Sequence, residues 1–125
     1  MSSKKRHATV IGVPLDYGAS KKGASGGPAA VRRANLVEGL EALGLEITDA
    51  GDLSVPKITA AAKGKLKNGP AILKVCQSLE KQTYEAVANG SVPITLGGDH
   101  SLAVGSVSGV ARAFRDKGRK IGLIW

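Results

Sequence analysis

The chain has 125 residues, 42% hydrophobic and 3% aromatic, with a formal net charge of +8. This length suits a single domain, and the absence of any apolar run near the ~20 residues of a membrane-spanning helix excludes membrane insertion. The basic residues are scattered with few aromatics among them, so nucleic acid is not expected as a partner, and one cysteine with no secretory signal indicates a cytoplasmic protein.

The first half of the chain alternates between strand and helix patterns. Residues 8–13 form a short apolar run typical of a strand, and a glycine-rich loop follows over 14–27. Apolar side chains then recur every three or four residues, which predicts one amphipathic helix over 28–43. Gly44 supplies its stop, and residues 45–50 alternate as a strand does.

The second half repeats this order. After a loop, the predicted elements are a helix over 71–89, a strand over 92–96, a turn at 97–101, a helix over 101–117 and a last strand at 121–125. Strands that alternate with helices indicate right-handed crossovers and a parallel sheet. Both faces of such a sheet must be covered, which agrees with the continuous apolar strands. The expected fold class is therefore α/β with a parallel sheet.

The turn GGDHS follows the strand 92–96 directly, at the sheet edge where α/β proteins bind ligands. The glycines permit a sharp turn, and Ser101 is placed to cap the next helix. His100 offers an imidazole to a divalent metal, and Asp99 can orient it or accept backbone N–H groups. Turn and cap chemistry alone remains an alternative for all three residues. His7 and Cys76 are expected to be an ordinary histidine and a buried small side chain.

Several stretches together resemble the N-terminal part of the arginase family of ureohydrolases. They are VIGVPLDYGASKKGASGGPAAVRRANL, GDLSVP and ITLGGDHSLAVGSVSGVAR, in that order, and the resemblance extends from about Thr9 to Trp125. It implies a three-layer α/β/α fold around a parallel sheet. Residues 1–125 would form the N-terminal portion of one such domain.

The resemblance also implies chemistry. In the family, two Mn²⁺ ions at the carboxyl edge of the sheet bridge a hydroxide that hydrolyses L-arginine to L-ornithine and urea. His100 would be a manganese ligand, and Asp99 would support it from outside the coordination sphere. The family's D-A-H-x-D and D-x-D motifs are absent from the 125 residues. We therefore assign no catalytic residue and expect this chain alone to be inactive.

Alternatives stay open on function and assembly. Agmatinase or another amidinohydrolase shares the scaffold, and a truncated, non-catalytic fragment that associates with other subunits is a different class of function. The resemblance implies a homo-oligomer, a trimer or hexamer. The loop 15–27 is expected either to border the active-site mouth or a subunit contact, or to be a flexible surface loop.

Overall fold

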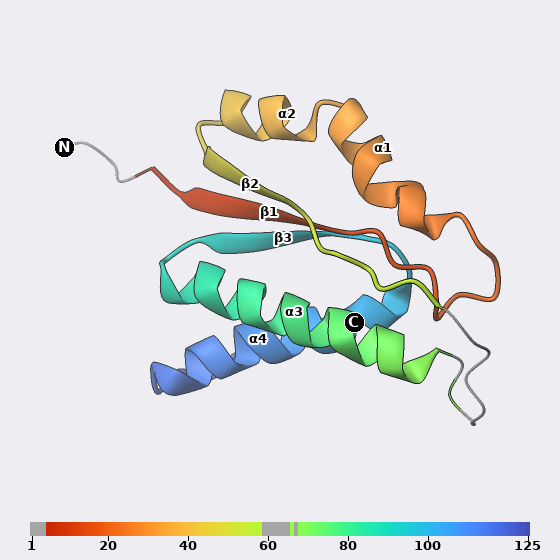
Figure 1. Ribbon diagram of the computed structural model, residues 1–125. Helices are drawn as coiled ribbons and strands as arrows, with labels where there is room; N and C mark the ends of the chain where they lie inside the picture. Colours follow the sequence, from red (N-terminus) through yellow and green to blue (C-terminus); the bar gives the residue numbers. More distant parts are fainter. Residues whose placement is uncertain (1–4, 59–65, 67) are drawn as a thin grey trace.

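The computed structural model describes residues 5–58, 66 and 68–125. Its centre is a parallel sheet of three strands in the order β2-β1-β3 (Figure 1). The strands are β1 (His7–Val13), β2 (Glu46–Asp52) and β3 (Val92–Gly97). Each begins and ends within two residues of a strand expected from the sequence, and the parallel pairing of β1 with both neighbours confirms the predicted parallel sheet.

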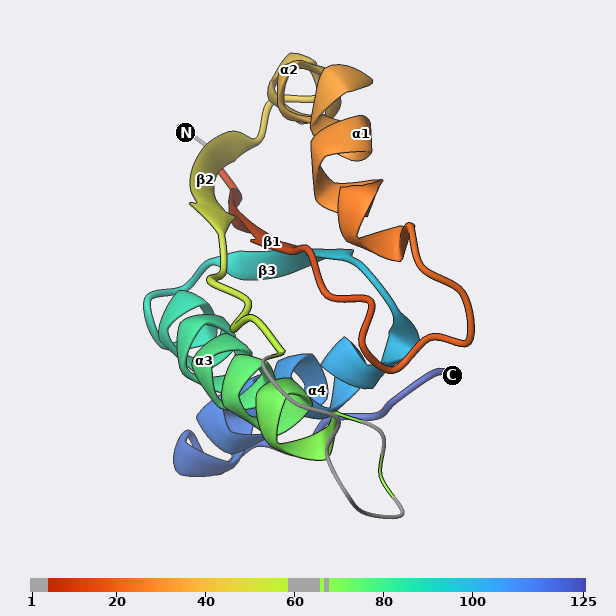
Figure 2. The same cartoon turned by 45° about the vertical axis from the view of Figure 1, so that its right-hand side comes forward.

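Two layers of helices cover the sheet. One face carries α1 and α2, and the other carries α3 and α4 (Figures 1 and 2). The helices are α1 (Gly27–Arg33), α2 (Leu36–Ala42), α3 (Gly69–Ala88) and α4 (Ala103–Asp116), with short 3₁₀ turns η1 (Ala24–Gly26) and η2 (His100–Leu102). The three-layer α/β/α class is thereby confirmed. None of the helices in the described ranges is both long and apolar enough to cross a membrane.

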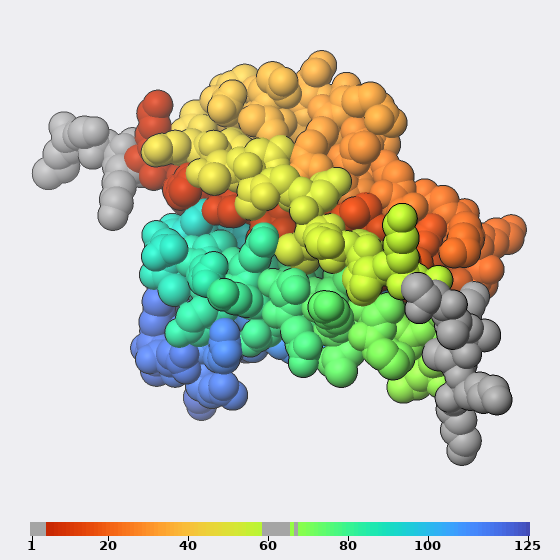
Figure 3. Space-filling view, viewed as in Figure 1, coloured from red at the N-terminus to blue at the C-terminus, as the bar shows by residue number. Residues whose placement is uncertain are grey.

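The hydrophobic core lies between β1 and the α3–α4 layer. Ile11 and Val13 of β1 are fully buried and belong to one cluster with Leu15, Val75 and Leu79. Because β1 is the central strand, both of its faces are covered, and every residue from Val10 to Val13 is buried. The edge strand β2 is mostly exposed. The space-filling view shows the α1–α2 layer on one side of the strands and the α3–α4 layer on the other (Figure 3).

Small residues let α3 and α4 approach closely. Gly105 and Gly109 are one helical turn apart on α4, and both are buried. A Cβ atom at Gly105 would collide with the carbonyl oxygen of Cys76, and one at Gly109 would collide with Thr83 on α3. Because the backbone of α4 lies directly against α3 here, any larger side chain is excluded at the two positions. The pair therefore fixes how deeply α4 packs against α3.

The predicted single helix over 28–43 is wrong, because the chain breaks it into α1 and α2. Asn35 lies between them in the left-handed conformation, with φ of 59° and ψ of 40°. Asparagine adopts this conformation more readily than most residues. The apolar spacing continues across the break, which is why periodicity alone did not reveal it.

The predicted strand at 121–125 is also wrong. This segment has no regular secondary structure, and Leu123, Ile124 and Trp125 are 61, 99 and 80% exposed. A strand needs a neighbour to complete its ladder, and none of β1, β2 and β3 pairs with this segment. Apolar composition was therefore insufficient to predict a strand here.

Arg32 of α1 joins the α1–α2 layer to β2. Its Nε and Nη2 atoms donate to the two carboxylate oxygens of Asp49 at 2.8 and 2.9 Å, and its Nη1 donates to Asp52. This two-bonded pairing is the strong geometry for a guanidinium and a carboxylate. The hydrogen bonds from Arg32 hold the pKa of the Asp49 carboxyl below its usual value.

We expect Asp49→Asn to lower the free energy of unfolding by about 1 kcal/mol at neutral pH, the upper end for a surface pair. Because the carboxyl pKa is lower in the folded chain, this stabilisation is present above the unfolded pKa of about 4 and is lost as pH falls through the lowered value. Urea unfolding from pH 7 to about pH 3 checks it. The difference in free energy of unfolding between wild type and the variant should disappear at low pH. A difference that stays constant would contradict the role of the charge. Glu38→Gln, at an exposed carboxylate on α2, is the control.

Candidate functional site

The turn from Gly97 to Ser101 leaves β3 at the carboxyl edge of the sheet. In the parallel register Val13, the last residue of β1, lies beside Gly97. The segments that follow β1 and β3 therefore leave the sheet at the same place. Ligand sites of open α/β sheets form at this edge, so the neighbouring segments are the natural place for a site.

The loop 14–27 is bound to this turn through backbone groups. The amide of Asp99 donates to the carbonyl oxygen of Leu15 at 2.7 Å, and the amide of Gly98 donates to that of Ala24 at 3.3 Å. Gly98 has a φ of +68°, and a Cβ there would lie 2.5 Å from the Val13 oxygen and 2.6 Å from the Leu15 oxygen. Only glycine satisfies both the conformation and the space.

The Asp99 carboxylate accepts three further hydrogen bonds. Its Oδ2 accepts from the amide of Gly18 at 2.7 Å, and its Oδ1 accepts from the Ser101 amide at 2.8 Å and the Ser101 hydroxyl at 2.5 Å. Burial alone would raise the pKa of this carboxyl, but the hydrogen bonds from Ser101 and Gly18 outweigh it and hold the pKa low. The carboxylate thus stays ionised and joins the loop to the turn.

The helix cap differs from the one expected. Asp99, in an extended conformation, caps the 3₁₀ turn η2 that precedes α4, and its side chain accepts from the Ser101 amide. The prediction that Ser101 caps the following helix is therefore wrong. The reason is that the first turn begins at His100, one residue before the predicted helix, so that Asp99 takes the cap position, and a carboxylate is a strong N-cap acceptor.

The loop also has internal order that sequence reasoning missed. The carboxylate of Asp16, which is 9% exposed, accepts from the Gly23 amide at 3.1 Å and the Ser25 hydroxyl at 3.2 Å. The bond from Gly23 is the main reason that the pKa of Asp16 is lowered. The Tyr17 hydroxyl donates to the Pro56 oxygen at 2.8 Å. An aspartate before a run of glycine and serine is a known turn-forming pattern and was the available signal.

His100 lies on η2 at this edge and is exposed. Its ring meets that of Trp125 edge-on, with 4.9 Å between the ring centroids and 80° between the planes. The imidazole is therefore not packed among aliphatic side chains. His7 begins β1 at the opposite, amino edge, where its Nε2 lies 2.8 Å from the Thr48 hydroxyl, in keeping with the expectation of an ordinary histidine.

Cys76 is buried on α3, as expected, with its thiol 3.4 Å from the Ser101 carbonyl oxygen. Burial raises the pKa of this thiol. A protonated, buried thiol is a poor nucleophile and a poor metal ligand. Cys76 therefore contributes packing beneath the turn.

The described residues do not form a complete metal site. Within residues 5–58, 66 and 68–125, no group of three or more histidine, cysteine, aspartate or glutamate side chains converges on one point. Asp99 already accepts three hydrogen bonds, so the exposed imidazole of His100 is the side chain of the turn that remains for a metal ion. Mn²⁺ prefers several carboxylate and imidazole ligands together. One imidazole fits as a single member of such a set and does not hold the ion alone.

In comparison with known proteins, residues 6–125 match the sequence model of the arginase family. An arginase of Staphylococcus aureus (strain COL) is 38% identical over 128 residues, covering 98% of this chain and 41% of that enzyme. The chain thus spans about two fifths of the length of this relative.

Solved structures agree with the fold. Arginase from Bacillus caldovelox is 36% identical with a TM-score of 0.79, over 87% of this chain and 37% of that one. A Trypanosoma cruzi formiminoglutamase with Mn²⁺ is 25% identical with a TM-score of 0.62, over 86% of this chain and 35% of that one. The three-layer fold is therefore shared with the part of these enzymes that the chain matches.

We expect Asp99→Ala to detach the loop from the turn. Removing the acceptor leaves the Gly18 amide and both Ser101 donors unpaired, which costs about 1–3 kcal/mol of stability. Amide hydrogen exchange measured by NMR should show the protection of Gly18 and Ser101 falling at least tenfold. Asp116→Ala, which removes a carboxylate bonded to the Tyr84 hydroxyl on the helical surface, should leave both amides protected. Unchanged exchange in the Asp99 variant would contradict the role of the carboxylate.

We expect Gly98→Ala to destabilise the fold by about 2–4 kcal/mol, because the methyl group meets two carbonyl oxygens in a left-handed backbone. Gly39→Ala is the matched control, since a Cβ at Gly39 in α2 meets no atom within 4 Å. That change should raise the free energy of unfolding by roughly 0.5–1 kcal/mol, because alanine has a higher helix propensity than glycine. Urea unfolding of both variants measures the difference, and equal effects would show that the turn is not tightly packed.

Proposed function

The chain belongs to the arginase family, and we propose that it forms the N-terminal portion of a ureohydrolase domain that converts L-arginine to L-ornithine and urea. The observation that supports this proposal is the placement of His100. It is exposed at the carboxyl edge of the sheet, in a turn fixed by the neighbouring loop through Leu15 and Gly18. A histidine held in this way is presented to ligands that other residues supply.

We assign His100 as a ligand of a manganese pair and Asp99 as the positioning residue behind it. A pair of Mn²⁺ ions would supply the activation of a water molecule for attack on a guanidinium carbon. This chain would hold the imidazole at the edge of the sheet. Asp99 does so by accepting from the amide of Gly18 in the loop after β1 and from the amide of Ser101 in the turn. The remaining ligands would come from residues outside the 125.

The proposed substrate is a guanidino compound, and we favour L-arginine because the relatives that match the chain include several named arginase. Agmatine is the alternative substrate, and it differs from arginine in lacking the carboxylate. We propose that the 125-residue chain alone is inactive. The proposed complete enzyme is a cytoplasmic homo-oligomer.

A chimera tests the proposal. The chain would replace the matched N-terminal segment of Bacillus caldovelox arginase, and urea release from L-arginine and from agmatine would be measured together with bound manganese. We expect about two manganese ions per chimera and release from arginine. His100→Ala should reduce the manganese content to about one and lower kcat/KM more than about 100-fold, since partners outside the coordination sphere alone cost 10–100-fold. Asp99→Asn should lower kcat/KM by about 10–100-fold.

His7→Ala is the matched control, because His7 is the other histidine and lies at the opposite edge of the sheet. It should leave the manganese content and urea release unchanged. Release from agmatine in preference to arginine would favour the alternative substrate. Full manganese content in the His100→Ala chimera would overturn the ligand assignment.

A further inference from the structure

The loop 14–27 is anchored firmly at its start. Leu15 is fully buried in the hydrophobic core. Tyr17 packs against the same core cluster, and its carbonyl oxygen accepts from the side-chain amide of Asn68 at 3.1 Å. Asp16 stands between these two anchored residues and is itself buried. Its carboxylate is therefore held in place by its neighbours in the chain.

The far end of the same loop has little apolar packing of its own. Ala24–Gly26 forms the 3₁₀ turn η1, in which no residue is buried and which no side chain caps. A Cβ atom at Gly23 or Gly26 would meet no atom within 4 Å. Segments with few buried apolar contacts open easily. The position of η1 therefore depends on its polar contacts more than on burial.

Asp16 and the turn provide these polar contacts. The Asp16 Oδ2 accepts from the Gly23 amide at 3.1 Å and from the Ser25 hydroxyl at 3.2 Å. Between these two donors in the chain, the Ala24 carbonyl oxygen accepts from the Gly98 amide at 3.3 Å. A continuous series of hydrogen bonds thus runs from Asp16 through η1 to the turn that carries the histidine.

The start of the loop is bonded to the same turn through Asp99. The Asp99 amide donates to the Leu15 carbonyl oxygen, and the Asp99 carboxylate accepts from the Gly18 amide, both at 2.7 Å. These two partners lie on either side of Asp16 in the chain. The start and the far end of the loop therefore both hold the turn, and Asp16 joins them into one closed network. Such networks are stronger than their separate contacts, because each bond holds the groups of the next in place.

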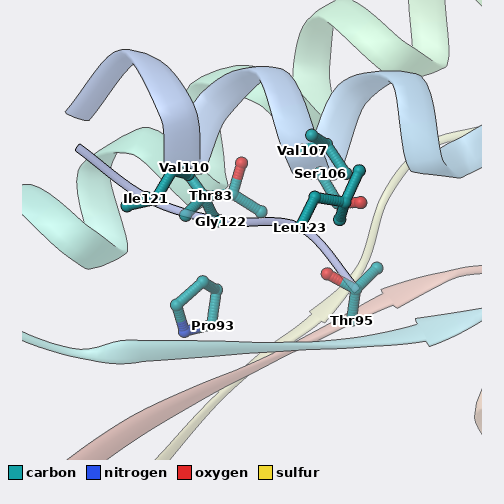
Figure 4. Close-up of a pocket in the computed structure, with 9 residues that line it drawn as sticks. All are labelled: Thr83, Pro93, Thr95, Ser106, Val107, Val110, Ile121, Gly122 and Leu123. Atoms are coloured by element: carbon teal, nitrogen blue, oxygen red, sulfur yellow. The ribbon is translucent and has the colours of Figure 1, made fainter. Parts of the chain in front are cut away.

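The polar contacts from the loop have no counterpart on α4. Between β3 and α4 lies a hollow of about 290 Å³, with Pro93 and Thr95 on the strand side and Val110 on the helical side (Figure 4). No residue of the turn lines this hollow. A change in the loop therefore reaches the turn through the hydrogen bonds of the loop and not through the packing of α4.

We propose that Asp16 is a positioning residue for His100. It holds η1 where the Ala24 carbonyl oxygen binds Gly98, and it thereby fixes the backbone two residues before the imidazole. Asp16 acts at a distance, since its carboxylate binds Gly23 and Ser25 of its own loop. The inference rests on the proposed function, because manganese is the ion for which His100 would be positioned. Partners outside a coordination sphere affect metal affinity through the ligands that they orient.

Amide hydrogen exchange in the ¹⁵N-labelled chain tests the link from Asp16 to the turn. Asp16→Ala removes the acceptor, so the Gly23 amide loses protection whatever else Asp16 does. The proposal predicts in addition that exchange at Gly98, which Asp16 does not touch, rises about tenfold, while Gly18 changes by less than about twofold. Asp16→Asn should keep Gly98 within about twofold of wild type, because an amide oxygen can accept the same two hydrogen bonds.

Tyr84→Phe is the matched control for this exchange experiment. It removes one hydrogen bond, from the Tyr84 hydroxyl on α3 to Asp116 on α4, and should leave exchange at Gly98 unchanged. Unchanged exchange at Gly98 in the Asp16→Ala chain would overturn the proposal. An equal rise at Gly18 and at all other amides would overturn it as well, because Asp16 would then only stabilise the fold.

Manganese affinity in the Bacillus caldovelox chimera gives a second readout, measured by competition with a chelator. Asp16→Ala should weaken manganese binding about tenfold, the lower end for a partner outside the coordination sphere, and Asp16→Asn should restore most of it. Ser25→Ala, which removes one of the two donors, should have a smaller effect than Asp16→Ala. Unchanged affinity in the Asp16→Ala chimera would overturn the positioning role. A chimera that binds no manganese before any substitution would instead refute the proposed function, and exchange at Gly98 would still decide whether Asp16 fixes the turn.

Discussion

The hydrogen bond from the Asp99 amide to the Leu15 carbonyl oxygen is the contact on which the site depends. It exists because β1 and β3 are parallel neighbours, so the segments that follow them leave the sheet side by side. Gly98 allows the two backbones to meet without side chains between them. The Asp99 carboxylate then reaches Gly18 across the same gap. The position of His100 is a consequence of this backbone contact.

Under the proposed assignment, this arrangement explains how His100 can be well placed although the described residues form no complete metal site. The hydrogen bonds that fix the turn come from residues after β1 and β3, all within the chain. Asp99 uses its carboxylate oxygens to hold the backbone, and His100 beside it is exposed. A preformed donor of this kind lowers the ordering cost that further ligands must overcome. In the proposed complete enzyme, this chain would position one imidazole, and residues outside the 125 would supply the charged ligands.

The alternation of strands and helices was predictable from sequence, because burial on a parallel sheet leaves a strong apolar pattern. The break at Asn35 was not, since apolar spacing continues through it. The segment 121–125 shows that an apolar run becomes a strand only beside a partner. At the site, sequence indicated His100 and Asp99, but the donors from Gly18 and the acceptor at Leu15 are backbone groups, which have no residue signature.

The central claim is that His100 stands at the carboxyl edge as a donor for manganese. The most direct measurement is paramagnetic broadening of the ¹⁵N-labelled chain by low concentrations of Mn²⁺, since even a transient contact with an ion that is not held tightly broadens the signals of the nearest nuclei. The account predicts that broadening is strongest at His100 and the adjacent residues 98–101, and that His7 is spared. Broadening centred on other parts of the chain, with His100 unaffected, would contradict it.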